Sequence, residues 1–225
     1  MATVTVSVQQ DLLAEKKRLA ADFRAACAAA GTLVVNLVSS PGAGKTSLLQ
    51  AMARHWSGKV SAGVLVGDIA TERDADRLRP LLPVQQLTTG GACHLDVGLV
   101  QRGLALLPEK TFDVLFIENV GNLVCPASHD LGEHLRVVLL SVPEGDDKPG
   151  KYPKMFRTSH ALVITKTDLL PYVPFSPDAA IADARLIQPQ LEVFQLSSLQ
   201  GAGIEDWCRF LLDARRRLTT TGQGG

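Results

Sequence analysis

The chain has 225 residues and a formal net charge of zero, and 46% of its residues are hydrophobic and 20% charged. This length and composition suit a single globular domain. A neutral chain without a long apolar run argues against nucleic acid or a membrane as partner. The N-terminus lacks a basic segment followed by an apolar one, so we expect a cytoplasmic protein.

The hydrophobic pattern predicts helices and strands that alternate along the chain. Apolar residues at helical spacing predict an N-terminal helix over 10–30, so that residues 1–31 pack on the following domain. Apolar β-branched runs predict strands at 32–38, 60–68, 112–121, 135–142, 159–168 and 191–198, with a strand or connector at 83–89. Helical patterns occupy 47–56, 71–82, 93–107 and 203–218. The alternation indicates an α/β fold with a mostly parallel central sheet and helices on both faces.

Two other segments lack this regularity. Residues 143–157 are polar and rich in Gly and Pro, which predicts a long surface loop of the kind that often carries function. Residues 219–225 predict a disordered tail. One domain is then expected over 32–218, with no linker that would divide it.

A phosphate-binding loop is predicted where the first strand meets the next helix. The sequence SSPGAGKTS at 39–47 contains the core of a Walker A motif, with Ser39 in place of its first Gly. Glycines let backbone N–H groups turn towards phosphate oxygens, while the lysine reaches the β and γ phosphates and the threonine hydroxyl binds Mg²⁺. A Gly-rich turn with an exposed lysine is the alternative, which the flanking strand and helix disfavour. The predicted nucleotide contacts are Gly42, Ala43, Gly44, Lys45, Thr46 and Ser47.

Two carboxylates are expected close to these phosphates. Asp68 and Glu118 end apolar strands, and in open α/β sheets the carboxyl ends of strands border the ligand crevice. Each could bind Mg²⁺ or orient water. A helix N-cap is the alternative for Asp68, and a surface charge is the alternative for Glu118. We assign catalysis to Lys45, Asp68 and Glu118, and magnesium to Thr46, Asp68 and Glu118; no arginine finger is obvious, with Arg73 and Arg77 as candidates.

The sequence TKTD at 165–168 predicts a site for guanine. An aspartate here accepts hydrogen bonds from guanine N1–H and N2–H₂, a donor pair that adenine lacks, so GTP is favoured over ATP. The lysine stem packs along the base. Thr165 in place of the usual Asn predicts a slightly weaker loop. SSLQGAG at 197–203 resembles a loop that contacts the guanine carbonyl, which gives Lys166, Asp168, Ser198 and Leu199 as base-site residues.

Three residues form a potential transition-metal site. Cys93 and His94 are adjacent at an expected helix start, and Cys125 follows the strand of Glu118. Thiolate and imidazole suit Ni²⁺ and Zn²⁺. One chain supplies an incomplete set that two chains meeting here could complete. The alternative is that both cysteines are small buried residues and the histidine caps a helix.

The remaining cysteines and histidines carry weaker signals. His129 and His134 follow Cys125 and could join the site, but we expect a solvated or structural role for each. Cys27 and Cys208 fall on apolar helix faces and are expected in the core.

Together these stretches resemble the HypB family, the GTPases that assist nickel insertion during [NiFe]-hydrogenase maturation. The resemblance covers most of residues 32–175, and it is carried by NLVSSPGAGKTSLL, GDIATERDADRL, TTGGACHLD, FIENVGNLVCPASHDLGE, SVPEGDDKPGKYPKMF and ITKTDLLPY. It implies a slow GTPase that uses GTP/GDP and Mg²⁺, and that forms a homodimer face to face over nucleotide. It also implies nickel or zinc at Cys93, His94 and Cys125 near the dimer interface.

The resemblance also implies partners. These are a HypA-type metallochaperone and the hydrogenase large-subunit precursor, and the 143–157 loop with Lys148 and Lys151 is implied to contact the partner chain or its nucleotide. Many family members carry an N-terminal CxxCGC or His-rich motif, which this sequence lacks. We therefore expect no N-terminal metal storage, and nickel that comes from a partner.

Three other functions fit parts of the pattern. The first is a nickel GTPase for another metalloenzyme such as urease, in which ENVGNLVCP is not expected. The second is a metal-binding module with vestigial nucleotide turnover. The third is an ATP-driven partitioning or kinase-type P-loop protein, against which TKTD argues.

Overall fold

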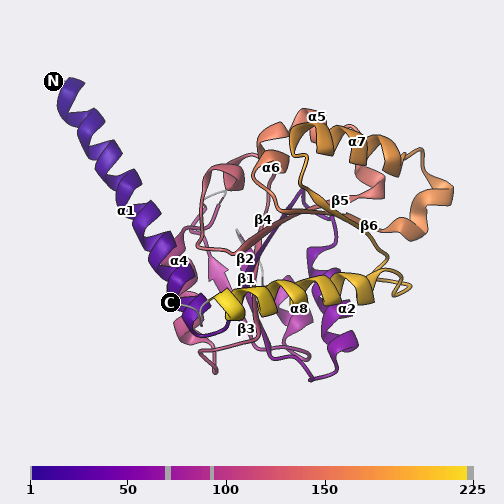
Figure 1. Cartoon of the computed structure of the whole chain (residues 1–225), viewed down its shortest axis with the longest axis horizontal. Helices are drawn as coiled ribbons and strands as arrows, with labels where there is room; N and C mark the ends of the chain where they lie inside the picture. Colours follow the sequence, from indigo (N-terminus) through magenta and orange to yellow (C-terminus); the bar gives the residue numbers. More distant parts are fainter. Residues whose placement is uncertain (1, 69–71, 92–93, 222–225) are drawn as a thin grey trace.

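A seven-stranded sheet forms the centre of the molecule (Figure 1). The computed structural model describes the backbone of residues 2–68, 72–91 and 94–221 and the side chains of 13–67, 72–91 and 94–220. All strand pairs are parallel, in the order β3-β2-β4-β1-β5-β6-β7. The strands are β1 Leu33–Ser39, β2 Ala62–Asp68, β3 Val84–Thr88, β4 Val114–Gly121, β5 Leu135–Ser141, β6 Ala161–Thr165 and β7 Glu192–Gln195.

Apolar strands make this sheet because both of its faces are covered. All seven residues of β1 are buried, as are the first seven of β4, so each side chain packs against a helix layer on one face or the other. Every strand that the sequence predicts is present. The predicted α/β architecture is confirmed, with a sheet that is entirely parallel.

Helices cover the two faces unequally. One face carries α2 Lys45–Trp56, α3 Arg73–Leu78 and α8 Ile204–Thr221, whose core includes Met52 and Trp207. The other face divides into two clusters. One cluster contains α1 Ala2–Ala29 and α4 Val97–Leu106, and the other contains α6 Pro153–Arg157 and α7 Pro177–Ile187, with α5 Lys148–Lys151 beside α7. Three 3₁₀ helices complete the chain: η1 Cys125–Ser128, η2 Val142–Glu144 and η3 Thr167–Tyr172.

The ends of the chain depart from expectation. α1 begins at Ala2 rather than near residue 10, and its first half projects beyond the body of the domain (Figure 1). α8 continues to Thr221, so residues 219–221 are helical, whereas the sequence predicts a tail from residue 219. Among the described residues, no helix has both the length and the apolar character needed to cross a bilayer.

The expectation of a long loop over 143–157 is wrong. The segment forms η2, α5 and α6, because Met155 and Phe156 are completely buried and anchor it to the sheet. α7 was not predicted at all. Its start is nevertheless encoded locally: Ser176 Oγ accepts a hydrogen bond from the Ala179 N–H at 3.2 Å, and Pro177 opens the first turn.

Two predicted helices are shorter than expected. The one predicted at 71–82 is α3, which covers Arg73–Leu78. The one predicted at 93–107 begins at Val97, because Asp96 caps it by accepting a hydrogen bond from the Leu99 N–H at 2.8 Å. His94 therefore precedes the helix and does not cap it.

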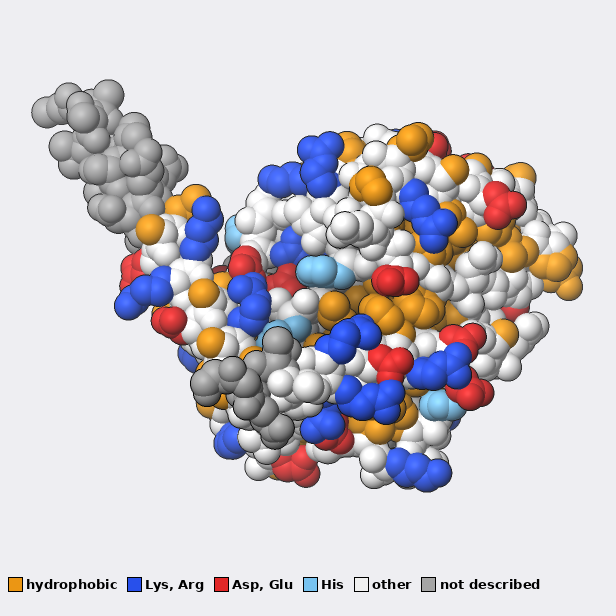
Figure 2. All heavy atoms as spheres, in the orientation of Figure 1, with side chains coloured by type: hydrophobic (Ala, Val, Ile, Leu, Met, Phe, Trp, Pro, Cys, Tyr) orange, Lys and Arg blue, Asp and Glu red, His pale blue; other side chains and the backbone are white. Residues whose placement is uncertain are grey.

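The surface agrees with a neutral chain. On the face shown in Figure 2, Lys and Arg side chains are interspersed with Asp and Glu, and no broad field of one sign covers it.

Candidate functional site

The turn between β1 and α2 forms a cradle at a helix N-terminus. Gly42 has φ +75° and Gly44 φ +94°, a backbone region that glycine adopts without strain. Gly44 directly precedes α2, whose first N–H groups point into the turn. Lys45 is only 8% exposed, and its Nζ donates to Ser39 Oγ at 2.9 Å. Ser39, the departure from the Walker pattern, therefore supplies an acceptor that glycine would lack.

Glu118 in β4 faces Thr46 in the first turn of α2. Thr46 Oγ1 donates to Glu118 Oε1 at 2.7 Å, and Glu118 is 3% exposed. Burial raises the pKa of Glu118 to about 7, although Lys45 and the Thr46 hydrogen bond oppose the shift. Its other oxygen, Oε2, is buried and has no hydrogen-bond partner within the part of the chain that the structure describes. An unsatisfied carboxylate oxygen next to a hydroxyl fits a hard, oxygen-preferring cation such as Mg²⁺.

The third residue that the sequence predicts to bind magnesium is Asp68. Asp68 ends β2, which pairs with β4 so that Val66 lies opposite Glu118. The side chain of Asp68 lies outside the described residues. Its role stays a prediction.

α3 contributes two residues, Asp74 and Arg77, to a cavity beside Glu118. The sequence gave no role to Asp74 and only a candidate role to Arg77. Asp74 and Arg77 line a cavity of about 250 Å³ together with Lys45, Thr46 and Glu118. Arg77 Nη2 donates to Ser47 Oγ at 3.2 Å. Of the two arginine candidates, Arg77 is therefore the one that lines the cavity. The spacing in the sequence already indicated that Asp74 and Arg77 share one face of a helix, because they are three residues apart.

A second cavity, of about 220 Å³, lies next to the cradle. It is lined by Gly44, Ser47, Thr165, Lys166, Asp168, Leu169, Ser198 and Leu199, which include all four predicted base-site residues. The Asp168 carboxylate accepts a hydrogen bond from Ser197 Oγ at 2.5 Å, and Ser197 is completely buried. Ser197 was not among the predicted base-site residues.

Two contacts tie this second cavity to the cradle. Lys166 has φ +58° and donates from Nζ to the Gly42 carbonyl at 2.8 Å. Thr165 Oγ1 donates to the Ala43 carbonyl at 2.7 Å. The hydroxyl of Thr165 thus joins the two loops, a contact that the expectation of a weaker loop did not include.

The predicted metal ligands are only partly visible. His94 and Cys125 are half-buried, and Cys93 lies outside the described residues. The His94 ring stacks on His129, with ring centroids 3.7 Å apart and an interplanar angle of 19°. Burial, with a contribution from His129, lowers the pKa of His94. Within the described residues, no group of three or more His, Cys, Asp or Glu is arranged to hold a metal ion.

The other histidines and cysteines have the structural roles expected of them. His134 Nδ1 accepts the Val34 N–H at 2.9 Å. Cys27 and Cys208 are buried, and burial raises the pKa of their thiols to about 11 and about 12. Such thiols stay protonated and inert at neutral pH.

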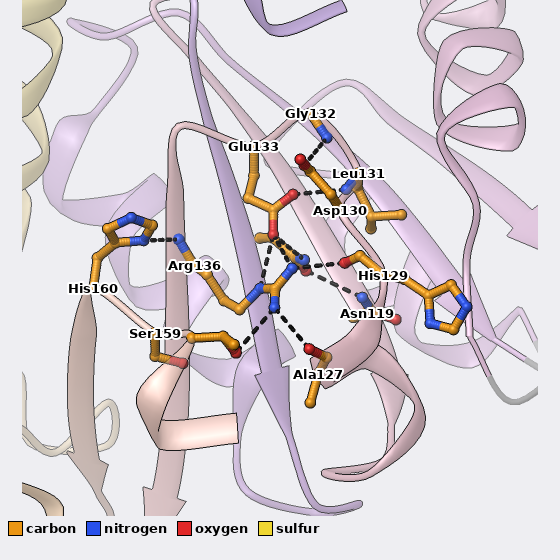
Figure 3. A network of polar contacts seen from close by, with 12 residues as sticks. Asn119, Ala127, His129, Asp130, Leu131, Gly132, Glu133, Arg136, Ser159 and His160 are labelled. Carbon is orange, nitrogen blue, oxygen red and sulfur yellow. Dashed lines mark hydrogen bonds and ion pairs between the residues drawn. The ribbon is translucent and has the colours of Figure 1, made fainter. Parts of the chain in front are cut away.

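A buried ion pair supports the segment that follows Cys125 (Figure 3). Arg136 and Glu133 are 7% and 6% exposed, and Arg136 Nη2 lies 2.6 Å from Glu133 Oε1. The same Nη2 donates to the His129 carbonyl at 2.6 Å. On the other side, Asn36 Nδ2 donates to Glu133 Oε1 at 3.2 Å and accepts through Oδ1 from Asn119 Nδ2 at 3.2 Å. The network reaches from the residue after Glu118 to the loop of Cys125, and no sequence motif announces it.

Comparison with known proteins decides the family. Residues 33–195 match the family model described as CobW/HypB/UreG, nucleotide-binding domain. The chain is 45% identical over 205 residues to the hydrogenase maturation factor HypB of Azotobacter vinelandii, an alignment that covers 91% of this chain and 68% of that protein. The chain belongs to the HypB family. A further HypB relative, the hydrogenase/urease maturation factor of Helicobacter pylori, is 39% identical over 216 residues, with 94% of this chain and 88% of that protein covered.

Solved HypB structures share the fold. The crystal structure of HypB from Helicobacter pylori in complex with nickel matches with a TM-score of 0.86 and 39% identity, covering 90% of this chain and 96% of that one. HypB from Archaeoglobus fulgidus matches with a TM-score of 0.83 and 37% identity over 90% of this chain and 99% of that one. The predicted resemblance to the HypB family, and with it the P-loop fold, is confirmed.

Proposed function

We propose that this chain binds GTP with Mg²⁺, hydrolyses it slowly to GDP, and couples this cycle to nickel insertion during [NiFe]-hydrogenase maturation in the cytoplasm. The observation that carries the proposal is the pairing of the phosphate cradle with the cavity that contains Asp168. Ser197 and the backbone contacts of Lys166 and Thr165 hold that cavity against the cradle. A carboxylate held beside a phosphate cradle suits guanine, whose N1–H and N2–H₂ groups can both donate to it. Adenine lacks that donor pair.

Each residue of the cradle has a specific part in hydrolysis. Lys45 exchanges Ser39 Oγ for β and γ phosphate oxygens, and the N–H groups from Gly42 to Ser47 bind the remaining oxygens. Thr46 and Glu118 would hold Mg²⁺, with Asp68 as the third predicted group. The ion supplies positive charge to the phosphates when bound. Asp68 or Glu118 orients the attacking water.

Nickel is the cargo in this proposal. Cys93, His94 and Cys125 bind Ni²⁺ or Zn²⁺, and His94 and Cys125 are half-buried, so a second copy of the chain can cover them. GTP favours the closed homodimer and GDP the open state, so metal affinity differs between the two. A HypA-type metallochaperone supplies the nickel and the hydrogenase large-subunit precursor receives it. This assignment comes from the family.

One alternative client has a specific observation in its favour. The Helicobacter pylori relative is named a maturation factor for both hydrogenase and urease. Addition of the nickel-loaded chain to each apoenzyme separates the two functions: activation of apo-urease alone would replace hydrogenase as the client.

The test is a Ni²⁺ titration of the purified chain with GDP and with a non-hydrolysable GTP analogue, with mass measured in parallel. We expect nickel affinity and dimerisation to change together with the nucleotide, and Cys125→Ala to remove the metal response. Equal nickel affinity in both nucleotide states would refute the coupling. Competition by ATP as strong as by GTP would refute the guanine assignment.

A further inference from the structure

The two cavities of the proposed nucleotide site share a boundary. Gly44, Ser47 and Lys166 line both the phosphate cavity of about 250 Å³ and the base cavity of about 220 Å³. In a guanine nucleotide the α-phosphate lies between the ribose and the β and γ phosphates. A nucleotide that spans the two cavities therefore places its α-phosphate at this boundary.

Arg77 reaches the boundary from α3. It lines the phosphate cavity, and its Nη2 donates to Ser47 Oγ at 3.2 Å. Because the Ser47 oxygen accepts from Arg77, the hydrogen of the same hydroxyl is available to donate to a phosphate oxygen. The guanidinium of α3 and the hydroxyl of α2 thus offer donors at one point.

Gln50 holds Arg77 at both ends of the residue. Arg77 Nη2 donates to Gln50 Oε1 at 3.0 Å, and Gln50 Nε2 donates to the Arg77 carbonyl at 2.9 Å. The backbone and the guanidinium are therefore both fixed against α2. A side chain that is positioned in this way loses less conformational entropy when it binds an anion.

The guanidinium still has donors to offer. Of its five N–H groups, the contacts within the described part of the chain use two on Nη2, while Nη1 lies 3.5 Å from Asp74 Oδ1. The Nε hydrogen and a second Nη1 hydrogen remain, and the side chain is 48% exposed, so an anion can reach it. The planar fork of arginine matches the oxygens of a phosphate.

We propose that Arg77 binds the α-phosphate of the guanine nucleotide, together with the Ser47 hydroxyl. The inference rests on the proposed function and adds a substrate-binding residue to it. The α-phosphate is common to GTP and GDP and does not change during hydrolysis, so this contact stabilises substrate, transition state and product alike. Uniform binding of this kind lowers KM and leaves kcat unchanged, whereas an arginine finger on the γ-phosphate raises kcat.

The experiment removes the guanidinium and supplies ligands with none, one or two phosphates. Guanosine, GMP and GDP compete with a fluorescent GDP analogue for the full chain with Mg²⁺ present. We expect Arg77→Gln to weaken GMP and GDP about tenfold or more, because a charge-assisted hydrogen bond is lost, and to leave guanosine binding unchanged. Arg77→Lys keeps the charge without the fork and should lose less.

Arg79→Gln is the matched control. Arg79 follows α3 directly, is exposed to a similar degree, and pairs with Glu72 and Asp76. The substitution removes the same charge from the same segment, and we expect wild-type affinity for all three ligands. In steady-state turnover, Arg77→Gln should raise the KM for GTP and leave kcat within about threefold of the wild type.

Each other result overturns the inference in a distinct way. A lower kcat with unchanged GDP affinity places Arg77 at the γ-phosphate, and a loss for GDP without one for GMP places it at the β-phosphate. A loss that extends to guanosine shows a structural role. Unchanged affinities in Arg77→Gln, with weaker GDP binding in Asp168→Asn, overturn the inference and leave the proposed function intact. If the wild type binds no guanine nucleotide, both fail.

Discussion

The phosphate cradle and the proposed metal-binding segments are built in opposite ways. Lys45, Thr46 and Glu118 are buried, and they project from the first turn of α2 and from β4. His94 and Cys125 are half-buried, one in an irregular segment and the other in a 3₁₀ helix. Buried groups on regular elements are already positioned for a fixed ligand such as a phosphate. Half-exposed groups on loops can rearrange when a partner or an ion arrives.

One buried network joins these regions. Asn119 follows Glu118 in β4 and hydrogen-bonds Asn36, which hydrogen-bonds Glu133, and Glu133 pairs with Arg136. Arg136 then binds the carbonyl of His129. The segment of Cys125 and His129 is therefore anchored by groups as buried as Lys45, Thr46 and Glu118. Four predictions test the contrast between the two regions, from the largest expected effect to the smallest.

Arg136→Met should give the largest effect, because it leaves the Glu133 carboxylate buried without its partner. We expect the free energy of unfolding to fall by about 3–5 kcal/mol, measured by urea denaturation. Nickel affinity should fall as well, since the His129 carbonyl loses its anchor. The double variant Arg136→Met with Glu133→Leu should recover much of the stability. A loss below about 1 kcal/mol in the single variant would contradict the buried pair.

Glu118→Gln should separate turnover from stability within the nucleotide site. The amide binds Mg²⁺ poorly, so we expect GTP turnover to fall by about 100-fold. Burial raises the pKa of Glu118 to about 7, which means that the fold disfavours its charged form, so the thermal midpoint of the nucleotide-free protein should rise at pH 8. Asp113→Asn, near an end of β4 and remote from the cradle, is the control for turnover. An unchanged GTP turnover would remove Glu118 from the site.

Asp168→Asn should affect guanine recognition alone. Replacement of the carboxylate by an amide leaves one acceptor for the two guanine donors and sets an NH₂ donor against the other, and we expect GDP affinity to fall by about 100-fold, measured with a fluorescent analogue. Nickel affinity without nucleotide should stay within about twofold, because Asp168 is remote in sequence and structure from Cys125. Equal losses of both affinities would show that the two regions are not separable.

Protonation of His134 should produce the smallest effect. Burial lowers the pKa of His134 below its ordinary 6.5, so the unfolded chain binds the proton more readily than the folded one. The contribution of neutral His134 to the free energy of unfolding is therefore full above about pH 6.5 and falls as the pH drops below it. Its Nδ1 accepts the Val34 N–H, which a proton there would displace. Glu118, whose pKa is about 7, titrates in the same range in the wild type and in His134→Asn, so the comparison isolates His134. We expect the change in the free energy of unfolding between pH 7.5 and 5.5 to be less favourable in the wild type than in His134→Asn, by under about 1 kcal/mol.

The sequence predicted the strands and the turn of the cradle well, because each is a local pattern, and the predicted base-site residues line one cavity. Apolar β-branched runs, GAGKTS and TKTD identify their elements without knowledge of the rest of the chain. Its errors at 143–157 and at α7 arose where weak local signals competed with Gly and Pro. Met155 and Phe156 outweighed those residues once they had a sheet to pack against.

The sequence by itself thus determined the α/β fold with its mostly parallel sheet and the family, and it predicted the residues that line the cradle and the neighbouring cavity. Only the tertiary structure decided that Thr165 joins the two nucleotide loops, that Asp74 and Arg77 line the phosphate cavity, and that His129 stacks on His94. It also decided that Arg136 supports the loop of Cys125. The reason is physical. Motif spacing records neighbours along the chain, whereas these contacts join segments that come together only when the sheet and its helices pack.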